Sequence, residues 1–365
     1  MLTSGTIAET AATANAPTSS IVGQYRTVGR VIVVAVVGPT ATGKSDLALD
    51  LAEALSTPGP PAEIVNADAY QLYRGMDVGT AKVPPHERRG IVHHQLDVLD
   101  PLEEASVARY QASARADLDA IEARGARAVV VGGSGLYVRA LLDRMDFPGT
   151  DPQVRAELEE RAEREGRRAL HAELERQDPE AAARIGPTNT RRIVRALEVI
   201  AITGLPYSAT LPREEYVRPT VQLGLDCDRA VLDARVAARV ERMRRDGLVD
   251  EVLRLARIDD AGVVRGMGRT ASRAVGYAEI LDLVGAAAGP VLHEGDEDAA
   301  FEAITANTRR LARKQMGWFG RDPRVHWLDA GSPTLLDDAL AIVRAADAGT
   351  LPGPGEGPVR RSLGS

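Results

Sequence analysis

The clearest hydrophobic pattern in the chain is residues 31–37, Val-Ile-Val-Val-Ala-Val-Val. An unbroken run of mostly β-branched side chains predicts a strand that is buried on both faces, as in parallel sheets. The pattern then changes, and apolar residues return every three or four positions, at Leu47, Ala48, Leu51, Ala52 and Leu55. This spacing predicts a helix from about Lys44 to Leu55 with one buried face.

The same alternation of strand and helix continues to about residue 150. Residues 63–67 predict a short strand that ends at Asp68, and residues 128–131 predict a buried strand that ends in the glycine-rich turn 132–135. A helix is expected between them, at about 103–124, because apolar residues share one stripe there: Val107, Tyr110, Ala114, Leu118 and Ile121. This order is typical of a doubly wound α/β fold, whose ligands bind at the carboxyl ends of the strands.

Residues 151–215 carry helical signals only. Asp151-Pro152 and Asp178-Pro179 each place a capping acid before a proline at the first helical position. Residues 221–225 then return to the sheet, and residues 325–328 predict a last short strand. We therefore expect an α/β fold with a P-loop-type parallel sheet and helices on both faces, formed by residues 30–150 and 216–330, plus an all-helical insert at 151–215.

Composition restricts the setting of this fold. The chain of 365 residues has one cysteine, Cys227, which excludes an internal disulfide and a cysteine-based zinc site and fits the cytoplasm. No apolar run is long enough to span a membrane. Residues 1–29, rich in Thr, Ala and Ser, and residues 346–365, rich in Gly and Pro, are predicted to be disordered. A net charge of −7 argues mildly against a nucleic-acid partner.

The turn after the first strand has the spacing of a phosphate-binding loop. It reads Gly38, Pro39, Thr40, Ala41, Thr42, Gly43, Lys44 and Ser45. Glycines let backbone N–H groups approach phosphate oxygens, and the following helix presents its positive end. Lys44 can neutralise phosphate charge, and the Ser45 hydroxyl can reach Mg2+. The loop therefore predicts a polyphosphate ligand without specifying which one.

Three further residues are candidates for chemistry at this edge of the sheet. Asp68 suits a general base or a support for Mg2+, with a simple turn-capping role as the alternative. Arg235 and Arg239 lie four residues apart on one helical face, where they can clamp phosphate oxygens or be solvated. The strand 129–131 ends in glycines without the acid that NTP hydrolases use, so we expect the loop to hold a diphosphate that leaves.

Basic residues cluster in two places despite the acidic total. The two clusters consist of Arg184, Arg191, Arg192 and Arg195, and of Arg309, Arg310, Arg313, Lys314 and Arg321. With Trp318 and Phe319 nearby, they are candidates for contacts with a nucleic-acid backbone and with stacked bases. The alternative is a salt-bridged protein surface. His93 and His94 lack the spacing of a metal site, so a structural role is expected for them.

Several motifs together resemble the tRNA dimethylallyltransferase (tRNA isopentenyltransferase) family, bacterial type. The most specific is residues 68–82, Asp-Ala-Tyr-Gln-Leu-Tyr-Arg-Gly-Met-Asp-Val-Gly-Thr-Ala-Lys. The phosphate loop and residues 93–97, 132–137, 192–198, 275–277 and 308–315 follow the family's order, so that the resemblance spans about 31–330. Ala69 stands where many members have Ser, Ser134 where Thr is usual, and Arg191 where Gln is common.

The resemblance implies transfer of a dimethylallyl group from dimethylallyl diphosphate to N6 of the adenosine 3′ of the anticodon, assisted by Mg2+. It implies that Asp68 accepts the proton from the amine while Lys44, Ser45 and Arg239 act on the departing diphosphate, with Arg235 and residues 38–45 binding it. The insert is expected to grip the anticodon stem of the tRNA. The residues implied in tRNA binding are Asp68, Ala69, Tyr70, Gln71, Ser134, Arg155, Arg191, Arg192, Arg195, Arg273, Gly276, Tyr277, Arg313, Lys314 and Gln315.

Other functions remain open from the sequence. An isopentenyltransferase acting on free AMP or ATP would use the same chemistry, although the insert and the basic clusters favour a large RNA acceptor. A small-molecule kinase would also use the phosphate loop, although segment 68–82 argues against it. A non-catalytic RNA-binding module leaves the loop unexplained. A cytoplasmic monomer without a membrane partner is expected.

Overall fold

The computed structural model describes residues 31–56, 59, 61–210, 214–259, 263–286 and 294–351. Within these ranges the strands form one parallel sheet of six, in the order β3-β2-β4-β1-β5-β6. The strands are β1 (Val33–Val37), β2 (Ala62–Asn66), β3 (His93–His94), β4 (Arg127–Val131), β5 (Thr220–Asp226) and β6 (Val325–Asp329). The predicted parallel sheet is confirmed. The predicted disorder of residues 1–29 lies outside the described residues.

The central strand β1 explains why the first apolar run has no polar face. Val34 pairs with Val129 of β4 on one side and with Val221 of β5 on the other. Val34 and Val36 face a cluster formed with α1 (Lys44–Ser56) and α12 (Leu335–Asp347). Val33, Ala35 and Val37 face the opposite cluster. Successive strand residues point to opposite faces, so both faces had to be apolar.

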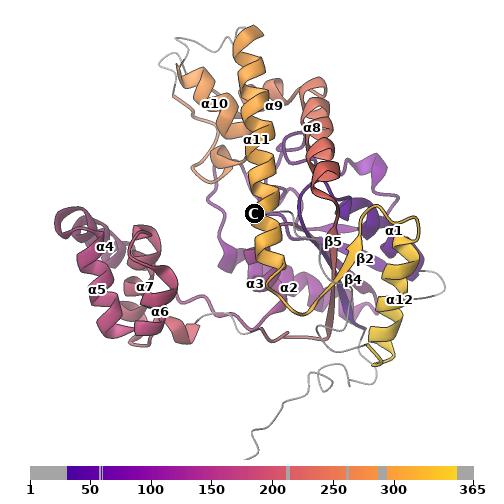
Figure 1. Ribbon diagram of the computed structural model, residues 1–365, viewed down its shortest axis with the longest axis horizontal. Coiled ribbons are helices and arrows are strands. Elements are labelled where there is room, and N and C mark those ends of the chain that lie inside the picture. Colours follow the sequence, from indigo (N-terminus) through magenta and orange to yellow (C-terminus); the bar gives the residue numbers. More distant parts are fainter. Residues whose placement is uncertain are drawn as a thin grey trace, which may run out of the picture.

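Helices cover both faces of the sheet, as predicted (Figure 1). The face opposite α1 and α12 is covered by α2 (Val107–Ala123) and α3 (Gly135–Leu142), while α8 (Arg229–Arg245) rises beyond the end of β5 and packs along α11 (Glu294–Phe319). The smaller elements α9 (Leu248–Ala256), η4 (Ala271–Arg273) and α10 (Tyr277–Ala286) lie beside the upper half of α11 in Figure 1. A single turn, η2 (Pro85–Glu87), precedes β3.

The predicted start of the C-terminal tail at residue 346 is wrong. Ala346 is fully buried in α12, and Asp347 forms an ion pair with Arg127 at 3.0 Å. The Gly and Pro residues that suggested a tail begin only after this helix. The α/β core therefore extends beyond residue 330, and residues 352–365 lie outside the described part.

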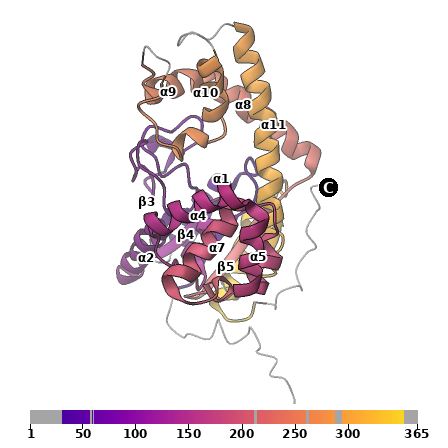
Figure 2. The same cartoon turned by 90° about the vertical axis from the view of Figure 1, so that its left-hand side faces the viewer.

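The insert is a bundle of four helices with its own core. It consists of α4 (Pro152–Glu165), α5 (Arg167–Gln177), α6 (Pro179–Ile185) and α7 (Thr190–Thr203), followed by the short turn η3 (Tyr207–Thr210). Its core contains Leu158, Leu170, Leu174, Ile193 and Leu197. Asp151 and Asp178 cap α4 and α6 through their side chains, as the Asp-Pro pairs predicted. Figures 1 and 2 show the bundle standing beside the sheet on two connecting segments.

One buried arginine fixes both connecting segments to the core. The segments pair with each other, because Arg144 N donates to Glu215 O and Val217 N donates to Leu142 O, each at 2.8 Å. Arg324, just before β6, binds Asp143 of the outgoing segment at 2.7 Å and lies 4.1 Å from the ring centre of Tyr216 in the returning segment. Asp322 also binds this guanidinium, at 2.7 Å. The insert is thus joined to the sheet through a buried ion cluster.

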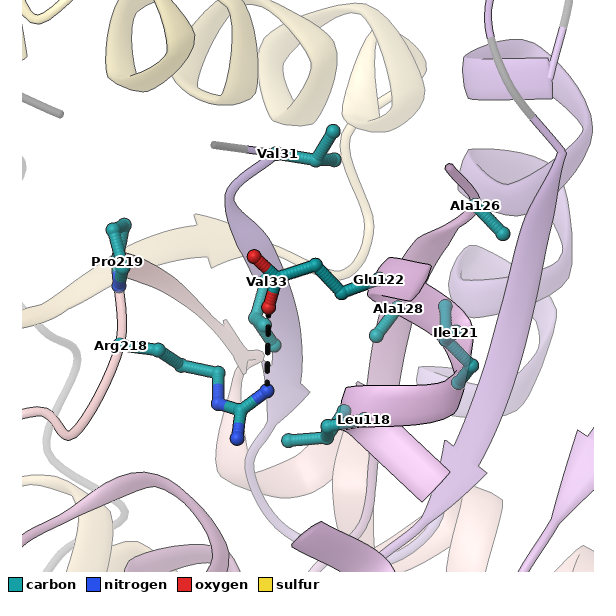
Figure 3. A pocket seen from close by; sticks show the side chains of 9 residues that line it. All are labelled: Val31, Val33, Leu118, Ile121, Glu122, Ala126, Ala128, Arg218 and Pro219. Atoms are coloured by element: carbon teal, nitrogen blue, oxygen red, sulfur yellow. Dashed lines mark ion pairs between the residues drawn. The ribbon is translucent and has the colours of Figure 1, made fainter. Parts of the chain in front are cut away.

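A small cavity of about 20 Å³ lies at the opposite end of the sheet from the phosphate loop (Figure 3). Val33 and Ala128 line it near the amino ends of β1 and β4, and Arg218 reaches toward Glu122 at 3.8 Å. This volume has room for about one water molecule. It is a packing defect of the core and not a substrate pocket. No helix in the described ranges combines the length and apolar character that crossing a membrane requires.

Candidate active site

The phosphate loop follows β1 and is locked by its own contacts. Gly38 has a φ of +130°, and a Cβ there would lie 2.7 Å from the Leu225 carbonyl oxygen. Gly43, with a φ of +87°, leads into α1 at Lys44. The Thr42 hydroxyl donates to Pro39 O at 2.8 Å, and Lys44 Nζ donates to the same oxygen at 2.5 Å. Two glycines are thus required by geometry, and the hydrogen bonds to Pro39 O fix the conformation of the loop.

Lys44 and Arg239 form a pair of partly buried cations beside this loop. Desolvation by burial, followed by the charge of Arg239, lowers the pKa of Lys44 to about 7, while the charge of Asp68 opposes the shift. Burial also lowers the pKa of Arg239. Arg239 Nη2 donates to Thr80 O at 3.3 Å, whereas its buried Nε has no partner in the part of the chain that the structure describes. Two neighbouring cations of this kind suit an anionic ligand.

Asp68 is the acid next to these cations, and its backbone is firmly held. Asp68 N donates to Asn66 Oδ1 at 3.0 Å, and Asp68 Oδ1 accepts from Tyr70 N at 3.0 Å. The Ser134 hydroxyl accepts from Ala69 N at 3.1 Å. The carboxylate is partly exposed, so one oxygen fixes the turn while the group stays accessible. The structure therefore brings the predicted residues Asp68, Lys44 and Arg239 together.

The structure gives a steric reason for the glycine-rich turn after β4. A Cβ at Gly132 would lie 2.3 Å from Ala67 O, and one at Gly133 would lie 2.4 Å from Gln315 Nε2. A Cβ at Gly135 would lie 2.0 Å from the Trp318 indole ring. Gln315 Oε1 also accepts from Thr40 N at 2.8 Å. Three of the four residues in this turn are glycines because Ala67, just after β2, and the α11 side chains Gln315 and Trp318 pack directly on its backbone.

Arg235 is placed differently from Arg239. Its Nη2 lies 3.5 Å from Ala330 O, in the turn after β6. Ser45, in contrast, lies in the first turn of α1, and its hydroxyl has no hydrogen-bond partner among the described residues. A role of Arg235 on phosphate stays a prediction, whereas Arg239 lies close enough to Lys44 for their charges to interact.

The sequence analysis missed Glu251, which organises segment 68–82. Its buried carboxylate accepts backbone N–H groups from Asp77, Val78 and Gly79. The available signal was an acid at helical spacing among apolar positions, since Glu251 lies between Leu248 and Val252 on the buried face of α9. Lys82 closes the same segment by binding Asp77 and Asp97, each at 2.6 Å.

Comparison with known proteins identifies the family. The model of the IPP transferase family matches residues 71–322. A tRNA dimethylallyltransferase of Bifidobacterium longum is 53% identical over 319 residues, covering 87% of this chain and 92% of the relative. One from Thermobifida fusca is 57% identical over 311 residues, covering 85% of this chain and 94% of the relative. The chain belongs to the tRNA dimethylallyltransferase family. The resemblance drawn from its motifs is confirmed.

Solved structures support the same fold. A tRNA isopentenylpyrophosphate transferase from Bacillus halodurans has a TM-score of 0.62 at 34% identity, covering 87% of this chain and 98% of that one. A eukaryotic dimethylallyltransferase acting on tRNA has a TM-score of 0.73 at 24% identity, covering 89% of this chain and 81% of that one, and at that identity it supports the fold alone. The P-loop-type α/β fold is therefore confirmed.

Among the residues that the tRNA dimethylallyltransferase resemblance implies in tRNA binding, five basic side chains are exposed. They are Arg191 and Arg192 on α7, Arg273 in η4, and Arg313 and Lys314 on α11. Arg155 and Arg195 instead bind the fully buried Glu198, at 2.5 and 2.9 Å. Arg155 therefore joins α4 to α7, whereas Arg195 lies on α7 itself and joins it to the segment before α4 by donating to Pro148 O at 2.6 Å. Only the remaining exposed surface of these two arginines is free for RNA.

Three of the residues that the resemblance implies in tRNA binding are buried in the structure. Tyr277 is fully buried and donates its hydroxyl to Glu251, so its side chain presents no surface to tRNA in this structure, and its implied role in tRNA binding stays a prediction. Gln315 is 8% exposed and holds the phosphate loop through Thr40. Gly276 is buried, and its N–H donates to Glu279 at 2.7 Å. These residues support the site through hydrogen bonds within the protein.

The two basic clusters are partly neutralised by acids from the same or neighbouring helices. Arg184 binds Glu180 at 2.9 Å, and Arg309 lies 3.6 Å from Asp233 of α8. Arg310 donates to Asn307, and Arg321 is exposed. Phe319 is 2% exposed, which excludes it as a stacking surface, whereas Trp318 is 37% exposed.

The two histidines have structural contacts. His94 Nε2 lies 2.6 Å from Glu63 Oε2, and His93 Nδ1 lies 2.8 Å from Ile91 O. These contacts attach the short edge strand β3 to β2 and the preceding loop. No group of three or more metal-ligating side chains occurs among the described residues.

Proposed function

We propose that this protein transfers a dimethylallyl group from dimethylallyl diphosphate to N6 of the adenosine adjacent to the anticodon on its 3′ side, releasing diphosphate. The observation that carries the proposal is the convergence of Lys44, Arg239 and Asp68 beside the phosphate loop. Two partly buried cations suit a leaving diphosphate, and one accessible carboxylate suits a proton acceptor. A tRNA substrate would place the protein in the cytoplasm.

Each residue then has a defined task. The bond from N6 to the allylic carbon forms as the carbon–oxygen bond to diphosphate breaks. Asp68 accepts the proton that N6 loses, and its turn holds the carboxylate in place through Tyr70 N. Lys44, Arg239 and the loop backbone stabilise the negative charge that develops on the leaving diphosphate. An anticodon-loop base must leave its stack to reach this site.

The site offers Mg2+ one protein ligand, the Ser45 hydroxyl. The described residues offer no cluster of protein ligands, but the Ser45 hydroxyl is unpartnered beside Lys44. Mg2+ is often held by one or two protein oxygens together with substrate phosphates. Ser45 would hold the ion, which when bound supplies charge stabilisation for the diphosphate.

Binding of inorganic diphosphate is expected to take up a proton. Because the pKa of Lys44 is about 7 in the free protein, its amine is mostly neutral at pH 8. A bound anion favours the charged form, so the pKa rises and uptake approaches about one proton. Calorimetry in Tris and HEPES measures this uptake from the difference in binding enthalpy. The same uptake in Lys44→Met would assign the proton to another group.

The exposed basic side chains of α11 are expected to contact tRNA phosphates. Changing Arg313 and Lys314 together to Gln should lower the slope of log affinity against log salt by about two, because two phosphate contacts are lost. Filter binding of tRNA at several salt concentrations measures the slope. The double variant Arg161→Gln/Arg164→Gln is the control, since these arginines pair with Glu173 and Glu160. If the two double variants show the same salt slope, Arg313 and Lys314 do not contact tRNA phosphates.

The function itself is tested by offering two acceptors side by side. Label from dimethylallyl diphosphate should pass to unmodified tRNA and not to AMP, and chelation of Mg2+ should stop it. Transfer to AMP alone would favour the free-adenylate enzyme. Transfer of the γ-phosphate from ATP to a small acceptor would favour a kinase.

A further inference from the structure

We propose that Glu251 is a positioning residue that holds Arg239 in the diphosphate site through the turn at residues 77–80. The inference rests on the proposed function for its catalytic consequence, but its structural basis is independent of the acceptor. Glu251 lies on α9, outside the phosphate loop, and touches neither Lys44 nor Asp68 in the described structure.

Four donors converge on the buried carboxylate of Glu251. Oε2 accepts from Asp77 N at 3.0 Å and from Val78 N at 2.9 Å. Oε1 accepts from Gly79 N at 3.1 Å and from the Tyr277 hydroxyl at 2.5 Å. No arginine or lysine pairs with it among the described residues. A carboxylate that is 3% exposed and lacks a cation is costly unless such donors satisfy it, so these contacts fix the turn firmly.

The packing around the turn leaves it one conformation. A Cβ at Gly79 would lie 2.4 Å from the Tyr277 ring and 2.9 Å from the Leu248 side chain. The Thr80 hydroxyl donates to Met76 O at 2.6 Å, and Lys82 donates to Tyr73 O at 2.9 Å. Glycine at position 79 therefore allows the backbone to approach both α9 and α10.

Thr80, the last residue of this turn, contacts the active site through its carbonyl oxygen. Thr80 O accepts from Arg239 Nη2 at 3.3 Å and from Gln71 Nε2 at 3.1 Å. Arg239 Nε has no partner in the described structure, so Thr80 supplies the hydrogen bond that orients this guanidinium. The Thr80 carbonyl thus connects Arg239, which we propose binds the diphosphate, to Gln71, which the family resemblance implies in tRNA binding. Glu251 sets the position of that carbonyl.

Glu251→Gln is expected to weaken the turn, because an amide replaces one acceptor oxygen with a donor that faces N–H groups. The affinity for inorganic diphosphate and kcat/KM for dimethylallyl diphosphate should each fall about 10-fold to 100-fold. Tyr277→Phe, which removes one of the four donors, should produce a smaller loss of about 3-fold to 10-fold. Calorimetry with inorganic diphosphate and steady-state kinetics with tRNA provide the two readouts.

A double-mutant cycle separates positioning from a general loss of structure. If Glu251 acts through Arg239, then Glu251→Gln should have little further effect on diphosphate affinity in an Arg239→Ala background. Glu104→Gln is the matched control, because Glu104 also accepts one backbone N–H and one hydroxyl, from Arg269 and Thr270, but has no contact with Thr80. Its diphosphate affinity should equal that of the wild type.

Additive effects in the cycle, or unchanged diphosphate affinity in both Glu251→Gln and Tyr277→Phe, would overturn this proposal. If Glu251→Gln does not fold, the cycle is run with Tyr277→Phe. A wild-type protein that transfers no label to tRNA would instead contradict the proposed function, and the effect of Glu251 on diphosphate binding would still be measurable.

Discussion

Asp68→Asn is expected to lower the turnover of transfer to tRNA by about 10²-fold to 10⁴-fold, the contribution typical of a general base. Asparagine retains the Oδ1 acceptor that binds Tyr70 N, so the turn after β2 should persist. It lacks the basicity needed to accept the proton from N6. The affinity for tRNA, measured by filter binding, should remain close to that of the wild type. Single-turnover transfer of labelled dimethylallyl groups measures the rate.

Asp100→Asn provides a matched control for this substitution. Asp100 Oδ1 accepts from Leu102 N at 3.0 Å, which is the same local geometry as at Asp68, and its ion-pair partner is Arg74. This variant should transfer at the wild-type rate. Wild-type turnover in Asp68→Asn would remove Asp68 from the role of base, and an equal loss in both variants would indicate that turn geometry matters instead.

Arg324→Met is expected to lower the free energy of unfolding by about 3–5 kcal/mol, the range typical of breaking a buried ion pair. The substitution leaves Asp143 and Asp322, both nearly fully buried, without their cation. It also removes the guanidinium from the Tyr216 ring. Urea unfolding followed by circular dichroism measures the loss. Because the insert depends on this cluster, the KM for tRNA should rise more than the KM for dimethylallyl diphosphate.

The pH dependence of this loss has a defined sign. Burial raises the pKa of Asp143 even in the wild type, where Arg324 opposes the shift. Without Arg324, the folded-state pKa of this carboxyl rises further above its unfolded value, so the folded variant gains protons as the pH falls. The deficit in unfolding free energy should therefore shrink as the pH falls toward the pKa of an unfolded aspartate, about 4. Arg89→Met, which breaks exposed pairs with Asp50 and Glu53, should cost less than about 1 kcal/mol. A deficit in Arg324→Met no larger than in Arg89→Met would contradict this account.

Local sequence patterns predicted the sheet and the insert because each pattern has a local cause. The run at 31–37 has to be apolar on both faces since β1 lies between two helical layers. Asp151 and Asp178 cap helices through backbone groups two or three residues away. The phosphate loop is likewise a local turn with fixed glycines. Helix α12 has an equally local pattern, because Ala339, Leu340, Val343 and Ala346 share its buried face.

Long-range contacts account for the site residues that the sequence did not reveal. Glu251 meets the turn at 77–79 from more than 170 positions along the chain. Tyr277 and Gln315 lie in motifs typical of the family, but only the packing of α10 and α11 shows that they face inward. The basic cluster on α11 has no acid within residues 305–321, whereas Asp233 reaches Arg309 from α8. Spacing in one segment carries no information about such partners.

The most direct test of the account is the position of the transferred group in tRNA. Purified protein, labelled dimethylallyl diphosphate, Mg2+ and unmodified tRNA are incubated, and the tRNA is digested and mapped. The account predicts one labelled nucleoside, N6-dimethylallyladenosine, at the position 3′ of the anticodon, and its loss in Asp68→Asn. Label elsewhere in the tRNA, or in AMP in place of tRNA, would contradict it.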